Sequence, residues 1–334
     1  MTMLRGILLV MLLWSAGVAA QAQSTGEMPS RSIQLWPNGV PTDSGTPPHG
    51  PERINHSGAV SNISQPRLVI YRPAQPNGAA VLIIGGGGYY EIGIAHEVEP
   101  TARWLATLGV TSAMLYYRLP ANGWKAIAPF QDGQRAMRIL RAQAAALGID
   151  AQRIGVLGFS AGGHLAGMLA TRSDDTFYAP MDATDRQSAR PDFAGLIYPV
   201  TSLQPPYDTT HAAHELSTQP DAASAYTVQL HVTRATPPSF IAHAADDPIA
   251  NVGASLELFD VLRKQQVPAE LHVFEQGGHG WGLGQAGAPV AAWPQLFANW
   301  AQLHGFFSAG TNPLPTTTTA APAHRHRHAS NRNP

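Results

Sequence analysis

The fold is decided by the stretch Arg153-Ile154-Gly155-Val156-Leu157-Gly158-Phe159-Ser160-Ala161-Gly162-Gly163-His164-Leu165-Ala166. Its apolar first part is typical of a buried strand, and the small residues after Ser160 favour a helix. Between the two, residues 158–162 match G-x-S-x-G, a strained strand-to-helix turn that pushes a serine out of the edge of a sheet. The glycines fit this turn because side chains there would clash. An ordinary turn serine is the alternative, but the flanking strand and helix favour Ser160 as a nucleophile.

Short apolar runs alternate with stretches of helical spacing on both sides of this motif. The predicted strands cover residues 67–71, 79–84, 110–116, 153–157, 193–198, 239–243 and 270–274. Apolar residues at helical spacing predict helices over 98–108, 136–147, 161–171 and 252–262. Because most of these strands are apolar on both faces, the sequence predicts an α/β fold whose mostly parallel central sheet has helices on both faces.

The composition is that of a globular protein with a large core. Hydrophobic residues make up 44% of the 334 residues, charged residues make up 13%, and the formal net charge is -1. Neither sign of charge dominates, so there is no electrostatic reason to expect a nucleic acid or an anionic membrane as a partner. The expected ligand is small or neutral.

The first 22 residues have the order of a secretory signal peptide. Arg5 precedes the apolar run Gly6–Trp14, and small residues end in Ala20-Gln21-Ala22, which predicts cleavage after Ala22. The alternative is a membrane anchor, but an anchor needs about 20 consecutive apolar residues, and this run is shorter than that. The sequence also has no cysteine, which excludes a disulfide framework and a thiolate metal site. We therefore expect export to a bacterial periplasm or medium, without a stable membrane anchor.

The remaining segments divide the chain further. Residues 23–65 are rich in Pro, Gly and Ser and predict an irregular arm, with short extended pieces near 33–36. The α/β domain is expected over 66–308, with a short insertion at 199–238 that shapes the substrate pocket. Residues 309–334 predict a disordered tail, whose His324–His328 alternation with Arg indicates a flexible basic segment more than a metal site.

A run of four glycines, Gly85 to Gly88, directly follows the predicted strand at 79–84. Backbone N–H groups can approach a ligand closely there, and two of them beside the N–H of Ala161 could hold a developing oxyanion. The pattern does not indicate a phosphate loop, because no Lys-Ser/Thr pair and no helix-opening G-x-G-x-x-G follow it. Gly87 and Gly88 are the favoured donors, and Gly86 remains a further candidate.

The acid and the base of a catalytic triad are expected in the loops after the last two strands. Asp247 is the favoured acid and Asp246 is the alternative, since either could instead be a turn residue that caps the next helix. His279 lies on a glycine-rich loop from which it could reach Ser160. The order Ser, Asp, His along the chain is the order that this type of fold uses. No metal or cofactor is needed for this chemistry.

Other histidines are interpreted as structural. This group comprises His96, His164, His243 and His272, and His164, four residues after Ser160, could help to pack the site.

Together these motifs resemble the bacterial α/β-hydrolases described as acetyl xylan esterases or xylanase-associated esterases, with dienelactone hydrolase and hormone-sensitive-lipase-like relatives. Besides the residue 153–166 stretch, the resemblance rests on residues 35–39, 85–90, 117–120, 132–136, 197–200, 243–248 and 278–280. It implies the α/β-hydrolase fold, the triad of Ser160, Asp247 and His279, and short-chain acyl esters as substrates, notably acetyl groups on plant polysaccharides. Gly85 departs from the His or Pro of the lipase-like relatives.

The expected activity is that of a secreted serine carboxylesterase that works through an acyl-enzyme. Its expected partner is a small acyl ester or an acetylated carbohydrate, for which Tyr89, Tyr90 and Trp281 are candidate contacts. The alternatives are a peptidase of the prolyl oligopeptidase kind, although no repeats precede the domain, and a noncatalytic binding protein on the same fold. A lipase is disfavoured because residues 199–238 show no amphipathic lid helix.

Overall fold

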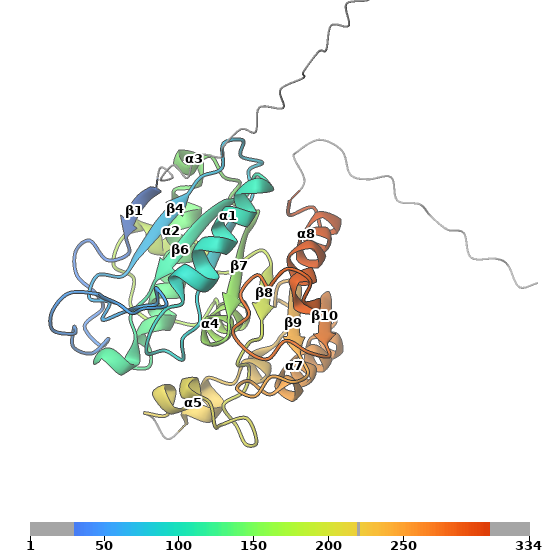
Figure 1. The fold of residues 1–334 in the computed structure, drawn as a ribbon. Helices are drawn as coiled ribbons and strands as arrows, with labels where there is room; N and C mark the ends of the chain where they lie inside the picture. The colour runs from blue at the N-terminus through green and yellow to red at the C-terminus, as the bar shows by residue number, and fades with distance from the viewer. Residues whose placement is uncertain (1–29, 219–220, 308–334) are drawn as a thin grey trace, which may run out of the picture.

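The computed structural model describes residues 30–218 and 221–307, and within these residues the main feature is one eight-stranded sheet (Figure 1). Its strands, in spatial order, are β1 (Ser30–Gln34), β4 (Arg67–Tyr71), β6 (Thr111–Tyr116), β5 (Ala80–Ile84), β7 (Ile154–Phe159), β8 (Ala194–Ile197), β9 (Ser239–Ala244) and β10 (Ala269–Phe274). All neighbours from β6 to β10 are parallel, whereas β4 is antiparallel to both β1 and β6. The predicted mostly parallel sheet is confirmed, with the ends of its strands shifted by at most two residues.

The centre of the sheet is also the centre of the core. Every residue of β5, β7, β8 and β9 is buried. Helices cover both sides of the sheet here, so side chains on both faces of these strands are buried. This explains why the sequences of these strands are largely apolar rather than alternating.

Longer helices cover the two faces. They are α1 (Glu99–Thr107), α2 (Ala128–Ala142), α4 (Ala161–Thr171), α7 (Val252–Lys264) and α8 (Trp293–Leu303). Figure 1 shows α1 in front of the sheet and α2 behind it. Trp104 of α1 packs against Trp293 of α8, with ring centroids 5.7 Å apart, so these two helices lie on the same face.

Shorter elements complete the chain between the strands. They are β2 (Arg53–Ile54), β3 (Val60–Ser61), α3 (Ala144–Leu147), α5 (His211–Leu216), α6 (Ala222–Ala225), the π-helical turn η1 (Ile94–Val98) and the 3₁₀ turns η2 (Pro120–Asn122), η3 (Ala183–Arg186), η4 (Val228–His231) and η5 (Pro289–Ala292). The predicted insertion at 199–238 contains α5, α6 and η4.

The described part of the predicted N-terminal arm is more regular than the sequence suggested. Strand β1 pairs with β4 along its whole length and forms one edge of the central sheet. The indole nitrogen of Trp36 then donates a 2.7 Å hydrogen bond to the buried carboxylate of Asp132 on α2. Residues 30–65 are thus anchored to the α/β domain by a strand and by a buried polar contact.

The predicted signal peptide, its cleavage site near Ala22 and the predicted tail at 309–334 all lie outside the described residues. Within residues 30–218 and 221–307, none of the helices has the length and apolarity needed to cross a bilayer.

Candidate active site

Ser160 sits at the turn between β7 and α4, where the backbone is strained. Its φ of 52° and ψ of -117° are uncommon for a residue with a side chain. Its backbone N–H donates to the carbonyl of Ile197 at 3.0 Å, which fixes the turn against β8. The geometry is that of the strained strand-to-helix turn that the G-x-S-x-G pattern predicts.

The glycines on either side of Ser160 are required by close backbone approach. A Cβ on Gly158 would lie 2.1 Å from the carbonyl oxygen of Gly162, and a Cβ on Gly162 would lie 2.2 Å from the carbonyl oxygen of Ile84. Both obstacles are backbone atoms, which cannot swing away. The turn and the end of β5 therefore pack together only in the absence of these two side chains.

We expect Gly162→Ala to lower the free energy of unfolding by about 1–3 kcal/mol, the usual cost of overpacking. The matched control is Gly167→Ala on the same helix, because a Cβ there would meet only methyl groups of Val228, at 3.0 Å. Urea unfolding followed by circular dichroism measures both changes. An equal effect of the two substitutions would contradict the argument from backbone contact.

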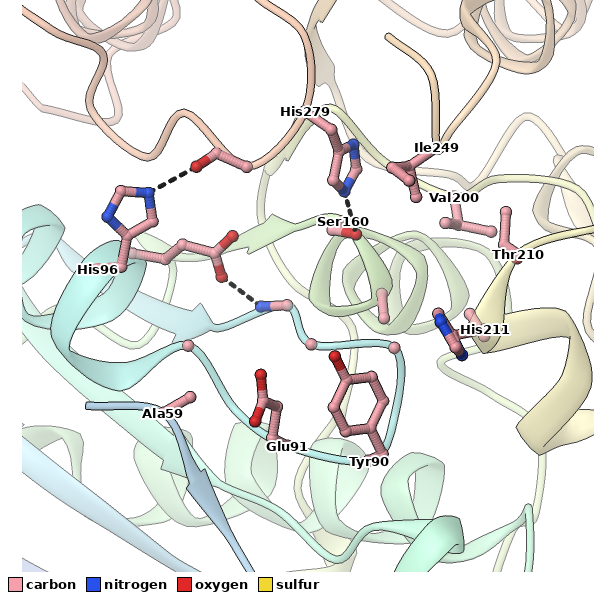
Figure 2. Close-up of a pocket in the computed structure, with 18 of the residues that line it drawn as sticks. Ala59, Tyr90, Glu91, His96, Ser160, Val200, Thr210, His211, Ile249 and His279 are labelled. Carbon is pink, nitrogen blue, oxygen red and sulfur yellow. Dashed lines mark hydrogen bonds between the residues drawn. The ribbon is translucent and has the colours of Figure 1, made fainter. Parts of the chain in front are cut away.

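His279 connects Ser160 with a buried carboxylate. Its Nε2 lies 2.8 Å from Oγ of Ser160, and its Nδ1 lies 2.7 Å from Oδ2 of Asp247. With hydrogen on Nδ1, the imidazole donates to Asp247 and accepts the hydroxyl proton of Ser160 on Nε2. Figure 2 shows His279 directly over Ser160. The three predicted triad residues, which lie 32 and 87 positions apart in the sequence, are therefore brought into one hydrogen-bonded chain.

The two neighbouring aspartates have different surroundings. The side chain of Asp247 is fully buried, and its Oδ1 accepts the N–H groups of Ile249 and Ala250 at 2.8 and 2.9 Å. Asp246 is exposed, and its Oδ1 accepts the N–H groups of Gly277 and Gly278. Asp247 thus contacts the imidazole directly, whereas Asp246 fastens the start of the loop that carries it.

The Asp247 carboxyl stays ionised because of its donors. Burial alone would raise its pKa, but hydrogen bonds from His243, His279 and the N–H of Ile249 hold that pKa well below its usual range. His243 is buried, with its Nε2 3.2 Å from Oδ2 of Asp247 and 2.8 Å from the carbonyl oxygen of Ala250. Since both neighbours of Nε2 are acceptors, this nitrogen carries the hydrogen. The sequence interpretation of His243 as structural missed this contact with the triad.

The glycine loop after β5 passes in front of Ser160. The N–H of Gly86 is already engaged, because it donates a 2.5 Å hydrogen bond to Oε2 of Glu97. Gly87 and Gly88 have φ values of 118° and 62°, in the region that glycine tolerates. Among the described residues, the N–H groups of Gly87, Gly88 and Ala161 have no hydrogen-bond partner. These three amides remain as candidate donors to an oxyanion.

The three aromatic residues predicted to contact substrate have different positions. Tyr90 lines the cavity beside Ser160 and is 41% exposed. Tyr89 points the opposite way into the core, where it is fully buried and its hydroxyl lies 2.7 Å from Nδ1 of His164. Trp281 also does not line the cavity, and its ring packs against Tyr198 at 4.5 Å. Burial corrects the prediction for Tyr89, which packs under the glycine loop.

His164 has the packing role that the sequence indicated. Its Nε2 lies 2.6 Å from the carbonyl oxygen of Tyr226, so Nε2 donates and Nδ1 accepts from Tyr89. Burial lowers the pKa of His164 to about 4, which keeps the ring neutral at ordinary pH.

A cavity of about 440 Å³ opens in front of Ser160 and His279. In Figure 2, Val200, Thr210, His211 and Ile249 lie on one side of Ser160, and His96 lies on the other. No local sequence pattern marks these lining residues, because they come from separate loops. Thr210 and His211 belong to the predicted insertion, which therefore does shape the cavity. Within the described residues, no cluster of three or more His, Asp or Glu side chains could hold a metal ion.

Comparison with known proteins places these features in a family context. The BD-FAE family model matches residues 68–262, which include Ser160 and Asp247 and end before His279. An acetylxylan esterase of Xylanibacter ruminicola is 29% identical over 237 residues, covering 67% of this chain and 45% of that protein. Endo-1,4-beta-xylanase B of Butyrivibrio fibrisolvens is 30% identical over 204 residues, covering 60% of this chain and 32% of that protein. The matched part spans less than half the length of these two relatives.

Solved structures share the fold over most of the chain. The acetyl ester-xyloside bifunctional hydrolase of Caldicellulosiruptor lactoaceticus has a TM-score of 0.68 and 32% identity, covering 83% of this chain and 97% of its own. The carboxylesterase Cest-2923 of Lactobacillus plantarum WCFS1 has a TM-score of 0.60 and 26% identity, covering 77% and 98%. The predicted α/β-hydrolase fold is confirmed.

Proposed function

The chain belongs to the BD-FAE family, and we propose that within it this protein is a secreted serine carboxylesterase that removes acetyl groups from plant polysaccharides or oligosaccharides. The observation that carries the proposal is the hydrogen-bonded chain from Ser160 through His279 to buried Asp247, which faces an open cavity. The relatives named for acetyl ester chemistry support the choice of acyl group.

The proposed proton transfers follow the hydrogen bonds from Ser160 to His279 and from His279 to Asp247. Oγ of Ser160 attacks the acyl carbon while its proton moves to Nε2 of His279, and the charge on the imidazolium is stabilised by Asp247. The carbonyl oxygen becomes an oxyanion, for which the N–H groups of Gly87, Gly88 and Ala161 are the donors. Collapse of this intermediate breaks the ester bond, and the departing sugar oxygen takes the proton from His279.

Water then completes the cycle. It loses a proton to His279 as it attacks the acetyl group on Ser160, and acetate leaves when the serine oxygen takes that proton back. No electron acceptor or cofactor enters either half of the reaction.

The lining of the cavity suggests where the two halves of the ester lie. Val200, Ala212 and Ile249 provide an apolar surface suited to a small acyl group. The exposed ring of Tyr90 at the rim, with the ring of His211 centred 5.5 Å from it, offers an amphipathic surface to a sugar. We assign the acyl group to the first surface and the alcohol to the second.

Export accords with such a substrate. A polysaccharide cannot enter the cell intact, and the signal-peptide pattern of residues 1–22 predicts release of the mature enzyme to a bacterial periplasm or medium.

Labelling with a fluorophosphonate probe tests the nucleophile directly. We expect the folded protein to be labelled on the peptide that contains Ser160, to hydrolyse p-nitrophenyl acetate, and to release acetate from acetylated xylan. Mass spectrometry locates the label, and an acetate assay measures the release. Absence of labelling in folded protein would indicate a noncatalytic binding protein. Labelling together with cleavage of proline-containing peptides, but of no acetyl ester, would indicate a peptidase.

A further inference from the structure

Glu97 is a buried carboxylate that the mechanism above does not use. It is 6% exposed, it lines the cavity with Ser160, and it lies on the π-helical turn η1. Buried carboxylates are rare unless they are paired, and π-helical turns occur often at functional sites. No ion pair to a Lys or Arg engages Glu97 among the described residues. Its position therefore depends on neutral hydrogen-bond donors.

The two oxygens of Glu97 reach two different loops of the active site. Oε2 accepts the N–H of Gly86 at 2.5 Å, in the loop that also carries Gly87 and Gly88. Oε1 accepts the hydroxyl of Tyr198 at 2.9 Å, and the oxygen of that hydroxyl accepts the N–H of Gly282 at 3.0 Å. Gly282 lies three residues after His279, in the segment 277–282, which we call the histidine loop. The carboxylate of Glu97 therefore joins the glycine loop, residues 85–88, to the histidine loop, and Tyr198 is the single residue between them.

The donors show which form of Glu97 the site fits. Tyr198 has one hydroxyl hydrogen, and since its oxygen already accepts from Gly282, that hydrogen is free to go to Glu97. The N–H of Gly86 needs the other oxygen. An ionised carboxylate accepts both bonds, whereas a protonated one has less acceptor capacity and adds an O–H that needs an acceptor of its own.

The same turn makes a second contact with the histidine loop. Nε2 of His96, the residue before Glu97, lies 2.5 Å from the carbonyl oxygen of Gly280, the residue after His279. Figure 2 marks this hydrogen bond as well as the one to Gly86. In addition, the ring of Tyr198 packs against the ring of His279, with centroids 5.0 Å apart.

We propose that Glu97 is a positioning residue, whose carboxylate holds the glycine loop and the His279 loop in the relative arrangement that the reaction needs. This inference rests on the proposed esterase function. The amide donors and the general base lie on different loops, and the η1 turn contacts both, since the N–H of Gly93 also donates to the carbonyl oxygen of Gly86 at 3.0 Å. A displacement of about 1 Å between such groups can cost roughly 100-fold in rate.

The charge of Glu97 adds an electrostatic effect on the base. The titratable groups around it are Tyr198, Tyr117, His96 and His279. Burial raises the pKa of Glu97, while hydrogen bonds from Gly86 and Tyr198 and the two histidines lower it in part. The negative charge of Glu97 attracts the positive charge that forms on the imidazole during the reaction, so this contribution is present above the Glu97 pKa and is lost as the pH falls through it.

Glu97→Gln tests the proposal. We expect kcat on p-nitrophenyl acetate to fall about 10- to 100-fold with KM within about twofold, because the amide NH₂ must face one of the two donors. We also expect the acid limb of kcat/KM against pH to move to lower pH, since the buried negative charge that attracts a proton to the site is lost. Glu99→Gln is the matched control, because Glu99 is exposed two residues further along the chain.

Tyr198→Phe provides a second variant, which keeps the carboxylate of Glu97. It also keeps the ring against His279 but removes one donor to Glu97, so we expect kcat to be reduced again, with an acid limb closer to the wild-type position than in Glu97→Gln. This variant decides the question if Glu97→Gln does not fold. Wild-type kcat and an unmoved acid limb in the folded variants would overturn the role of Glu97 while leaving the esterase function intact. A wild-type protein without labelling or activity would instead overturn the esterase function.

Discussion

Ser160→Ala is expected to abolish ester hydrolysis, with kcat on p-nitrophenyl acetate reduced on the order of 10⁶-fold. The attacking oxygen is lost, and no other described hydroxyl is hydrogen-bonded to His279. The amides of the glycine loop remain, so a residual rate above that in water is expected from oxyanion binding alone. Initial rates measured at high enzyme concentration, together with fluorophosphonate labelling, check both the loss and the disappearance of the label.

Ser188→Ala serves as the control for this substitution. Ser188 is exposed and lies outside the cavity, and its hydroxyl makes only a local hydrogen bond, to the N–H of Arg190; the guanidinium of Arg141 contacts its backbone carbonyl, which the substitution keeps. It should retain wild-type kcat and KM, and both variants should unfold at the wild-type temperature. Wild-type activity in Ser160→Ala would assign the nucleophile to another residue and would refute the proposed mechanism.

Local sequence patterns predicted those parts of the site that lie within one short segment. The turn at Ser160 is specified by glycines and by the strand and helix beside it, and all of these are adjacent in the chain. Asp247 and His279 could be placed because each follows a strand, and the carboxyl ends of parallel strands meet at one edge of a sheet. For the same reason the resemblance to acetyl xylan esterases, which rests on these segments, is confirmed by the family match.

Contacts between distant segments were beyond such patterns. The connection from Gly86 through Glu97 and Tyr198 to Gly282 joins four loops or turns, and nothing in the sequence marks Glu97 as buried. Tyr89 was misplaced for a geometric reason. It adopts a φ of 65°, so its side chain turns into the core while that of Tyr90 faces the cavity.

Two features of the fold are likewise missing from the sequence-based prediction. Strands β1 and β4 pair although the irregular residues 35–66 separate them, and no regular spacing in that segment indicates the pairing. Helix α8 is absent from the predicted elements, although Trp293, Phe297 and Trp300 recur at helical spacing and are buried. Pro294 in its first turn and the glycine-rich segment before it obscured the start of this helix.

Asp247→Asn is expected to lower kcat about 10⁴-fold, whereas Asp246→Asn should cost no more than about 1.5 kcal/mol in the activation free energy. The two residues are adjacent and the chemical change is identical, so each substitution controls for the other. Steady-state kinetics on p-nitrophenyl acetate measure both. A larger loss in Asp246→Asn would transfer the role of triad acid to that residue.

The reason for the difference lies in how many donors surround each carboxylate. Asp247 accepts on both oxygens, from the N–H groups of Ile249 and Ala250 on Oδ1 and from His243 and His279 on Oδ2. Whichever way an Asn amide is turned there, its NH₂ group faces two donors. If it faces His279, Nδ1 must become the acceptor, the hydrogen moves to Nε2, and the imidazole can no longer take the proton of the nucleophile.

Asp246 differs because only one of its oxygens is engaged. Both N–H groups that it accepts, from Gly277 and Gly278, point at Oδ1, so an Asn oxygen can replace that atom while the NH₂ group faces solvent. The loop that carries His279 then keeps its anchor and loses only the charge on the acceptor. The expected ratio between the two variants thus follows from the count of donors around each carboxylate, and it holds even if both variants lose some stability.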